Sequence, residues 1–98
     1  MDHKKKPRFD PRTDKLEDFL RDLLRRHSRT HVETIRDDDR VTADSGLDSM
    51  ALLETVLDVE EALDITIAED KMPTLVELNF AQFVAFVRGE LQAKGAAV

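Results

Sequence analysis

The chain has 98 residues, of which 41% are hydrophobic, and this is the size of one small domain with a modest core. It contains no cysteine, so disulfides, Cys-ligated zinc and thiol catalysis by its own side chains are excluded. The net charge of −6 is uneven, with +3 on residues 1–13 (five Lys/Arg, two Asp) and −9 on the rest, and an acidic body of this kind argues against nucleic-acid binding.

The N-terminal segment is charged and lacks the apolar run of a secretory signal, and no segment has the length and apolarity that span a bilayer. We therefore expect a cytoplasmic, monomeric protein with no membrane or nucleic-acid partner. Residues 1–12 are basic and are interrupted by Pro7 and Pro11. They predict a flexible tail ahead of a helical domain at residues 13–95.

The first predicted helix starts at Thr13 or Asp14, either of which can cap it, and its last turn contains Arg25, Arg26 and His27. Acidic residues at its start and basic residues at its end suit the helix dipole. Its apolar residues recur at helical spacing and predict one buried stripe: Leu16, Phe19, Leu20, Leu23 and Leu24.

Residues 28–48 have no sustained period and predict a long loop, which is uncommon in a compact domain and is often functional. Three scattered apolar residues, Val32, Ile35 and Val41, are available to pin this loop to the helices. Its end reads DSGLDSM, with Asp-Ser at 44–45 and again at 48–49. Ser45 precedes Gly46 and predicts a turn residue, whereas Ser49 stands where a helix starts. There it can cap the helix or present its hydroxyl at the positive end of the helix dipole.

The helix predicted at residues 49–63 has two apolar stripes. The first predicts a core face and comprises Leu52, Val56, Val59 and Leu63, and the second begins beside Ser49 and comprises Met50, Leu53 and Leu57. Acidic residues lie between them, and no Lys or Arg occurs from 41 to 70. An apolar strip with an acidic rim favours docking to basic, apolar-lined recesses of other proteins. A helix buried on two sides, with solvated acids, is the structural alternative.

Beyond this helix, "DITIA" is a short β-branched stretch, and a brief helix at 74–78 is predicted to start at Pro73 or Thr74. A longer helix runs from Asn79–Gln82 to Ala93 and is ended by Gly95. Its apolar side is Phe80, Phe83, Val84, Val87 and Leu91. The predicted fold is all-α, a four-helix bundle of three main helices and one short helix, with a long loop between helices one and two.

Residues 46–70, GLDSMALLETVLDVEEALDITIAED, resemble the prosthetic-group segment of acyl and peptidyl carrier proteins. That family's pattern is Gly-x-Asp-Ser-Leu/Met, then an apolar and acidic helix, then Glu-Glu-x-Phe/Leu-x-Ile/Val-x-Ile. The match runs without a gap through Asp48-Ser49-Met50, Glu60-Glu61, Leu63 and Ile67. The chain length and the flanking helices also fit, and the resemblance is to free-standing type II carriers.

By this resemblance, a phosphopantetheinyl transferase attaches 4′-phosphopantetheine from coenzyme A to Ser49, with Mg²⁺ held by the transferase. The arm carries an acyl or aminoacyl group as a thioester, loaded and used by ligases, synthases or transferases acting in trans. Asp48 flanks the site and contributes to transferase recognition, and Gly46 permits the turn before it. The partner-facing residues that the resemblance implies are Met50, Leu53, Glu54, Leu57, Glu60 and Glu61.

The resemblance also implies a carrier with no catalytic residue and no metal of its own, in fatty acid, lipid, polyketide or nonribosomal peptide biosynthesis. Ile65 and Ile67 would close the end of the bundle. Charge reversal at Glu60 and Glu61 together should slow partner reactions with little loss of fold. The cargo, and whether the bundle shelters it, are left open by the sequence.

The chain departs from the family pattern at several positions. Ala43 and Ser45 stand where relatives carry apolar residues, so we expect a loop that is anchored less firmly. Ala68 replaces a common Pro, and Pro73 falls within the usual third helix, which predicts that this helix is displaced to 74–78. The basic N-terminal extension has no counterpart in the family pattern.

Three other functions compete with the carrier interpretation. An enzyme could pair Ser49 with His31, or a metal could bind His27 and His31, but no carboxylate lies at ligand spacing beside them. A calcium loop starting at Asp37 would have Thr42 where glycine is needed and Asp48 in place of Glu. The strongest rival is a small helical protein-interaction adaptor without a prosthetic group.

Overall fold

Four α-helices and one 3₁₀ turn form the regular structure of the computed structural model, which describes residues 8–10, 12–30 and 33–95. The elements are α1 (Leu16–His27), α2 (Ser49–Leu63), η1 (Glu69–Lys71), α3 (Met72–Val76) and α4 (Phe80–Ala93). Within the described ranges there is no strand, only an isolated bridge between Arg40 and Asn79. The predicted all-α bundle, with its long loop between the first two main helices, is confirmed.

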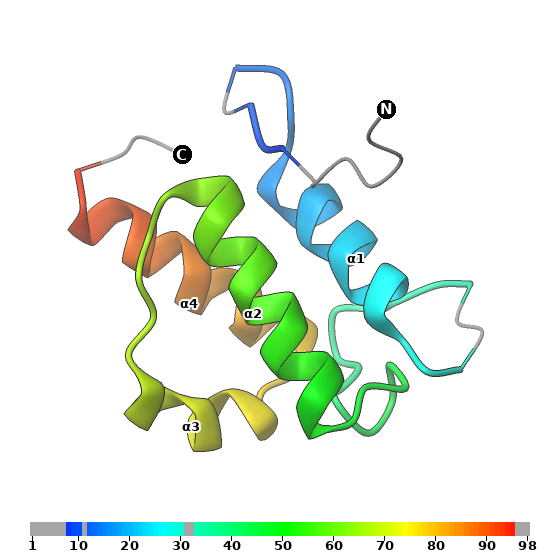
Figure 1. Cartoon of the computed structure of the whole chain (residues 1–98). Coiled ribbons are helices and arrows are strands. Elements are labelled where there is room, and N and C mark those ends of the chain that lie inside the picture. Colours follow the sequence, from blue (N-terminus) through cyan, green and yellow to red (C-terminus); the bar gives the residue numbers. More distant parts are fainter. Residues whose placement is uncertain (1–7, 11, 31–32, 96–98) are drawn as a thin grey trace, which may run out of the picture.

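The helices surround a single core. α1 and α2 run in opposite directions, α4 lies behind α2, and the short α3 closes the lower edge (Figure 1). Buried side chains from the four helices and from the long loop meet in this core. No helix within the described ranges is long and apolar enough to cross a membrane.

The first helix begins later than predicted. Thr13 and Asp14 do not cap it; they belong to a preceding turn, where Asp14 Oδ2 accepts a hydrogen bond from the Asp10 N–H at 2.8 Å. That turn places Phe9 against Phe19 of α1, with ring centroids 5.3 Å apart. Contacts with the domain therefore begin within the segment predicted as a tail, while residues 1–7 and 11 lie outside the described residues. Of the predicted apolar stripe, Phe19 is partly buried and the four leucines are buried: Leu16, Leu20, Leu23 and Leu24.

The long loop is firmly attached to the bundle, so the expectation of weak anchoring was wrong. Ile35 and Val41 are buried as predicted, and Leu47 joins them, while Val32 lies outside the described residues. Ser45 is fully buried, and its hydroxyl donates to the Arg40 carbonyl at 3.0 Å. A hydrogen-bonded serine thus occupies the place of an apolar anchor.

The loop is also tied to the start of α4 through the backbone. The Val41 N–H donates to the Leu78 carbonyl at 3.1 Å, and the Phe80 N–H donates to the Asp39 carbonyl at 2.8 Å. These bonds satisfy donors and acceptors that would otherwise be unpaired inside the fold. They also hold the loop across the end of the bundle from which α2 starts.

The short third helix was predicted at 74–78 but lies at Met72–Val76, directly after η1. Pro73 falls in its first turn, where a proline costs nothing because the N–H it lacks would have no helical partner. The displacement inferred from Pro73 was therefore wrong. Leu75 is fully buried and fixes this helix to the core.

The last helix follows the prediction closely. Asn79 caps α4, with its side chain accepting from the Gln82 N–H at 2.8 Å while the Gln82 side chain accepts from the Asn79 N–H. Gly95, with φ +94°, follows the helix. The buried residues of α4 are those predicted: Phe80, Phe83, Val84, Val87 and Leu91.

Candidate functional site

The residue that caps α2 is Asp48. Its backbone is extended, and its Oδ1 accepts a hydrogen bond from the Ala51 N–H at 2.8 Å. This bond is the main reason why the pKa of the Asp48 carboxyl lies below its ordinary value, and the Arg29 guanidinium lowers it further. The sequence analysis allowed Ser49 to cap this helix, but the cap is Asp48.

Ser49 is the first residue of α2 and is exposed. None of the residues that the structure describes forms a hydrogen bond with its hydroxyl, because Asp48 already satisfies the backbone donor that a capping serine would bind. The hydroxyl stands at the positive end of the helix dipole, where an attached phosphate is favoured. The site therefore fits a covalent phosphate ester, since Ser49 is exposed and its hydroxyl is not bonded to any of the described residues.

A tight turn leads into this site. Gly46 has φ +71°, in the left-handed region, and its carbonyl accepts from the Arg29 N–H at 2.7 Å. A Cβ at this position would overlap the Thr30 hydroxyl and lie 2.6 Å from Ser28 Oγ. The predicted role of Gly46 in the turn is confirmed, and the close approach of residues 28–30 gives a second reason for glycine.

The two apolar stripes of α2 face different environments. Leu52, Val56, Val59 and Leu63 are buried, together with Ala51 and Thr55. The second stripe is exposed, at 58% for Met50, 41% for Leu53 and 54% for Leu57. The structural alternative, a helix buried on two sides, is therefore wrong for the described residues. We call Met50, Leu53 and Leu57 the exposed stripe.

Two carboxylates beside the exposed stripe have basic partners within the chain. His27 Nε2 lies 2.7 Å from Asp58 Oδ2, and His27 Nδ1 lies 3.6 Å from Glu54 Oε1. Arg29 Nη2 also approaches Glu54 Oε1, at 3.8 Å. These pairs were not predicted, although RRHSR at residues 25–29 contains the basic side chains. Contacts between elements far apart in sequence have no periodic signal.

Glu60 also has a structural task. Its Oε2 accepts a hydrogen bond from the Ile67 N–H at 2.7 Å, which holds the segment after α2 against the helix. The expectation that Glu60 can be reversed in charge with little loss of fold is therefore not supported. Glu61 is exposed. Ile65 and Ile67 are buried in the core, as expected.

Among the described residues, those named for the alternative functions do not assemble into a second site. His27 is paired with Asp58 of α2, and His31 lies outside the described residues. Asp37, where a calcium loop would start, is bound by Arg21, with Nη2 2.6 Å from Oδ1. In the described part of the chain, no group of three or more His, Cys, Asp or Glu side chains is arranged to hold a metal ion.

Comparison with protein families places this geometry in context. The family model described as a phosphopantetheine attachment site matches residues 16–79, which is more than half of the chain. Comparisons with curated proteins and with solved structures gave no significant match. The matched range contains α1, the long loop, α2 and α3, including the turn at Gly46 and the free hydroxyl of Ser49. The chain therefore belongs to the family of carrier proteins that bind 4′-phosphopantetheine covalently.

Proposed function

We propose that Ser49 is the attachment residue and that the chain is a free-standing carrier of acyl or aminoacyl groups. The observation that carries this proposal is the exposed Ser49 hydroxyl at the start of α2, relieved of capping by Asp48. In the modification, Ser49 Oγ forms a bond to the phosphorus that bears pantetheine. The pyrophosphate bond of coenzyme A breaks, adenosine 3′,5′-bisphosphate leaves, and the hydroxyl loses its proton. The attached arm supplies a thiol, which the chain lacks, for thioester formation.

The exposed stripe is the proposed docking face for the phosphopantetheinyl transferase and for the enzymes that load and use the carrier. Three large apolar side chains in a row on one helix supply contact area. Leu57, Glu61 and Ile65 also line a wide groove of about 740 Å³. Carboxylates around the stripe would steer basic partners, so association should weaken as salt rises.

Several further assignments belong to the same proposal. The carrier domain spans residues 13–95, residues 1–12 form a basic extension, and the protein acts as a cytoplasmic monomer that performs no catalysis itself. Its pathway would be fatty acid, lipid, polyketide or nonribosomal peptide biosynthesis. Intact mass spectrometry of the protein from its native host, with the arm released and its load weighed, would identify the cargo.

The modification is tested by mass spectrometry. The chain is incubated with coenzyme A, Mg²⁺ and a broad-specificity phosphopantetheinyl transferase, and one phosphopantetheine should be added. Ser49→Ala should remain unmodified, whereas Ser45→Ala, which alters the buried serine of the other Asp-Ser pair, should still be modified if circular dichroism shows that it folds.

No gain in mass on the unaltered, folded chain would contradict the carrier proposal and favour a helical adaptor without a prosthetic group. A gain that persists in Ser49→Ala would contradict the assignment of the residue while leaving the carrier function in place.

A further inference from the structure

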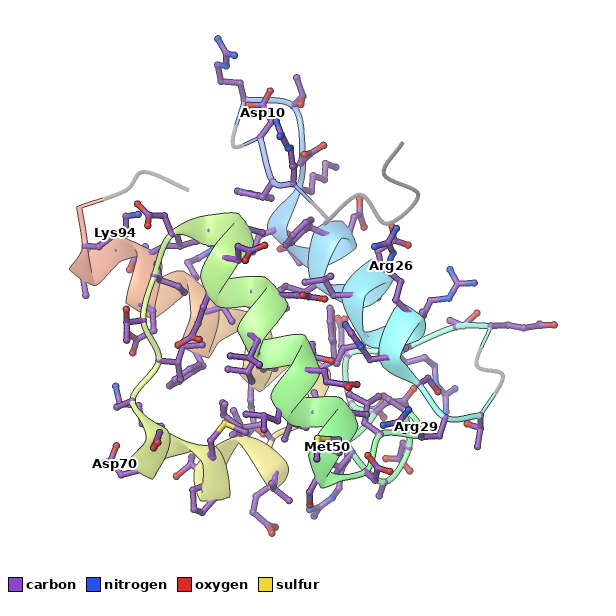
Figure 2. The ribbon with its side chains drawn as sticks, in the orientation of Figure 1. Asp10, Arg26, Arg29, Met50, Asp70 and Lys94 are labelled. Atoms are coloured by element: carbon purple, nitrogen blue, oxygen red, sulfur yellow. The ribbon has the colours of Figure 1, made fainter. Side chains whose placement is uncertain are left out.

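Arg29 brings a positive charge to the start of α2. Its Nε lies 3.4 Å from Asp48 Oδ2, and its Nη2 lies 3.8 Å from Glu54 Oε1. The side chain comes from the loop after α1 and reaches the N-terminal end of α2, where Met50 is labelled (Figure 2). Its target Asp48 is the residue directly before Ser49.

The position of Arg29 is fixed by its backbone. Its N–H donates to the Gly46 carbonyl at 2.7 Å, within the turn that leads to Ser49. The side chains of Ser28 and Thr30, on either side of it, pack so closely on Gly46 that a Cβ there would not fit. The arginine is therefore held beside the site by two neighbouring contacts and not only by its ion pairs, which at a surface contribute little.

The local charge balance gives this arginine a specific role. No Lys or Arg occurs from residue 41 to residue 70, so a cation at the start of α2 must come from another segment. Arg29 approaches two carboxylates, those of Asp48 and Glu54, and a phosphodiester on Ser49 would add a negative charge directly after Asp48. Asp48 Oδ1 is already engaged by the Ala51 N–H, and only Oδ2 faces Arg29.

We propose that Arg29 binds the phosphodiester that links the prosthetic arm to Ser49, an inference that rests on the proposed function. A guanidinium has five N–H donors in a planar fork that suits phosphate oxygens. Within the described residues, its side chain pairs only with Asp48 and Glu54. The side chain is 52% exposed, so donors remain accessible to a group attached next to Asp48. Arg29 is thus a positioning residue for the base of the arm.

Two NMR measurements on the full chain test this proposal. The first follows the side-chain Nε–Hε resonance of Arg29 before and after modification by coenzyme A and the transferase, and a shift is expected for Arg29 but not for Arg26. Arg26 is a matched control because it lies higher on α1, away from Met50 (Figure 2). The second compares the ³¹P resonance of the modified wild type with those of modified Arg29→Gln, Arg29→Lys and Arg26→Gln.

The expected ³¹P result is a displaced resonance in Arg29→Gln, a smaller displacement in Arg29→Lys, and no change in Arg26→Gln. An Arg29→Gln spectrum identical to wild type would overturn the proposal. If the Ala51 amide resonance shows that Arg29→Gln disturbs the cap, the Nε–Hε resonance of the unaltered chain decides, and no shift on modification would overturn it. If Ser49 gains phosphopantetheine but these resonances do not change, only the inference about Arg29 fails. If Ser49 gains no mass, the proposed function fails as well.

Discussion

At the scale of single residues, Asp48 caps α2 and thereby leaves Ser49 available for the attachment that we propose. A serine that caps a helix directs its oxygen to backbone N–H groups, and a serine that carries a phosphate must direct the same oxygen to solvent. Asp48 takes the cap by accepting from the Ala51 N–H. This leaves the hydroxyl of Ser49 accessible, with the helix dipole behind it.

Asp48→Ala should destabilise the fold at neutral pH, because the Ala51 N–H loses its partner. Asn79→Ala, which removes the cap of α4, should also destabilise the fold, by about 1 kcal/mol. Asp48→Asn keeps an acceptor oxygen and should change the stability much less. Chemical denaturation of the three variants measures the differences, and an Asp48→Ala variant as stable as the wild type would show that the cap contributes nothing.

Acid should weaken this cap. Since the pKa of Asp48 is lower in the folded state, its ionised form stabilises the fold above the ordinary carboxyl pKa of about 4. The contribution is lost as the pH falls through the lowered pKa. The melting temperature of the wild type should therefore fall in this range more steeply than that of Asp48→Asn. Some acid sensitivity should remain, because the pKa of Glu17 is also lowered, mainly by a backbone hydrogen bond and then by Arg88.

At the scale of elements, the two stripes of α2 differ in burial, and the docking face that we propose is the exposed one. The buried stripe holds the helix to the core, whereas the exposed stripe contributes little to folding because its members remain accessible to water. Some of the acidic residues between the stripes serve the fold as well. Glu60 holds the Ile67 N–H, and Asp58 holds His27.

Leu57→Ala should leave the fold almost unchanged and weaken docking by on the order of 1 kcal/mol. The measurement is kcat/KM of phosphopantetheinyl transfer to the variant, together with its melting temperature. Leu52→Ala, five residues earlier on the buried stripe, is the matched control and should cost about 2–5 kcal/mol of stability. Equal transfer rates for Leu57→Ala and wild type would exclude Leu57 from the face that the transferase uses.

Substitution of Glu60 should lower the melting temperature, whereas substitution of Leu57 should not. Glu60→Lys removes the acceptor of the Ile67 N–H and should lower the melting temperature, so slow turnover by that variant would not by itself report on docking. A charge-reversed Glu60 with an unchanged melting temperature would instead restore the view of Glu60 as a pure recognition residue.

At the scale of the whole molecule, the long loop links the starts of α2 and α4 beside the candidate site. Its first residues pack on the turn at Gly46, its middle is bonded to the start of α4, and Arg29 reaches the start of α2. Figure 1 shows the loop gathered at this end of the bundle. The position of Ser49 is thus set by segments on both sides of it in sequence.

Gly46→Ala should destabilise the fold by about 2 kcal/mol, because it forces a positive φ on a residue with a Cβ and pushes that Cβ into Thr30. Gly89→Ala is the opposite control: it lies inside α4 with open space around it, and should stabilise by about 1 kcal/mol. Urea unfolding of both variants measures these changes. A neutral Gly46→Ala would mean that residues 28–30 move away freely.

The sequence by itself determined the helices, the buried stripes and the candidate serine. Helical period and caps act over a few residues, so α2 was predicted at the residues where it lies, and the apolar side of α4 was predicted completely. Local chemistry was less decisive at the start of α1 and at α3. There Thr13, Asp14 and Pro73 each have more than one low-energy position near a helix end.

Only the tertiary structure decided which charged and polar side chains are free. Glu60 and Asp58 are acidic residues of the kind expected on a docking surface. In the structure, however, Glu60 accepts from the Ile67 N–H and Asp58 pairs with His27. Ser45 and Ser49 each follow an aspartate, yet Ser45 is buried and donates to a carbonyl, whereas Ser49 is exposed. Arg29 reaches Asp48 across nineteen positions of sequence. Such contacts form between residues far apart in sequence and depend on how the loop folds back over the helices. Helical periodicity and capping patterns, which act over a few residues, do not predict them.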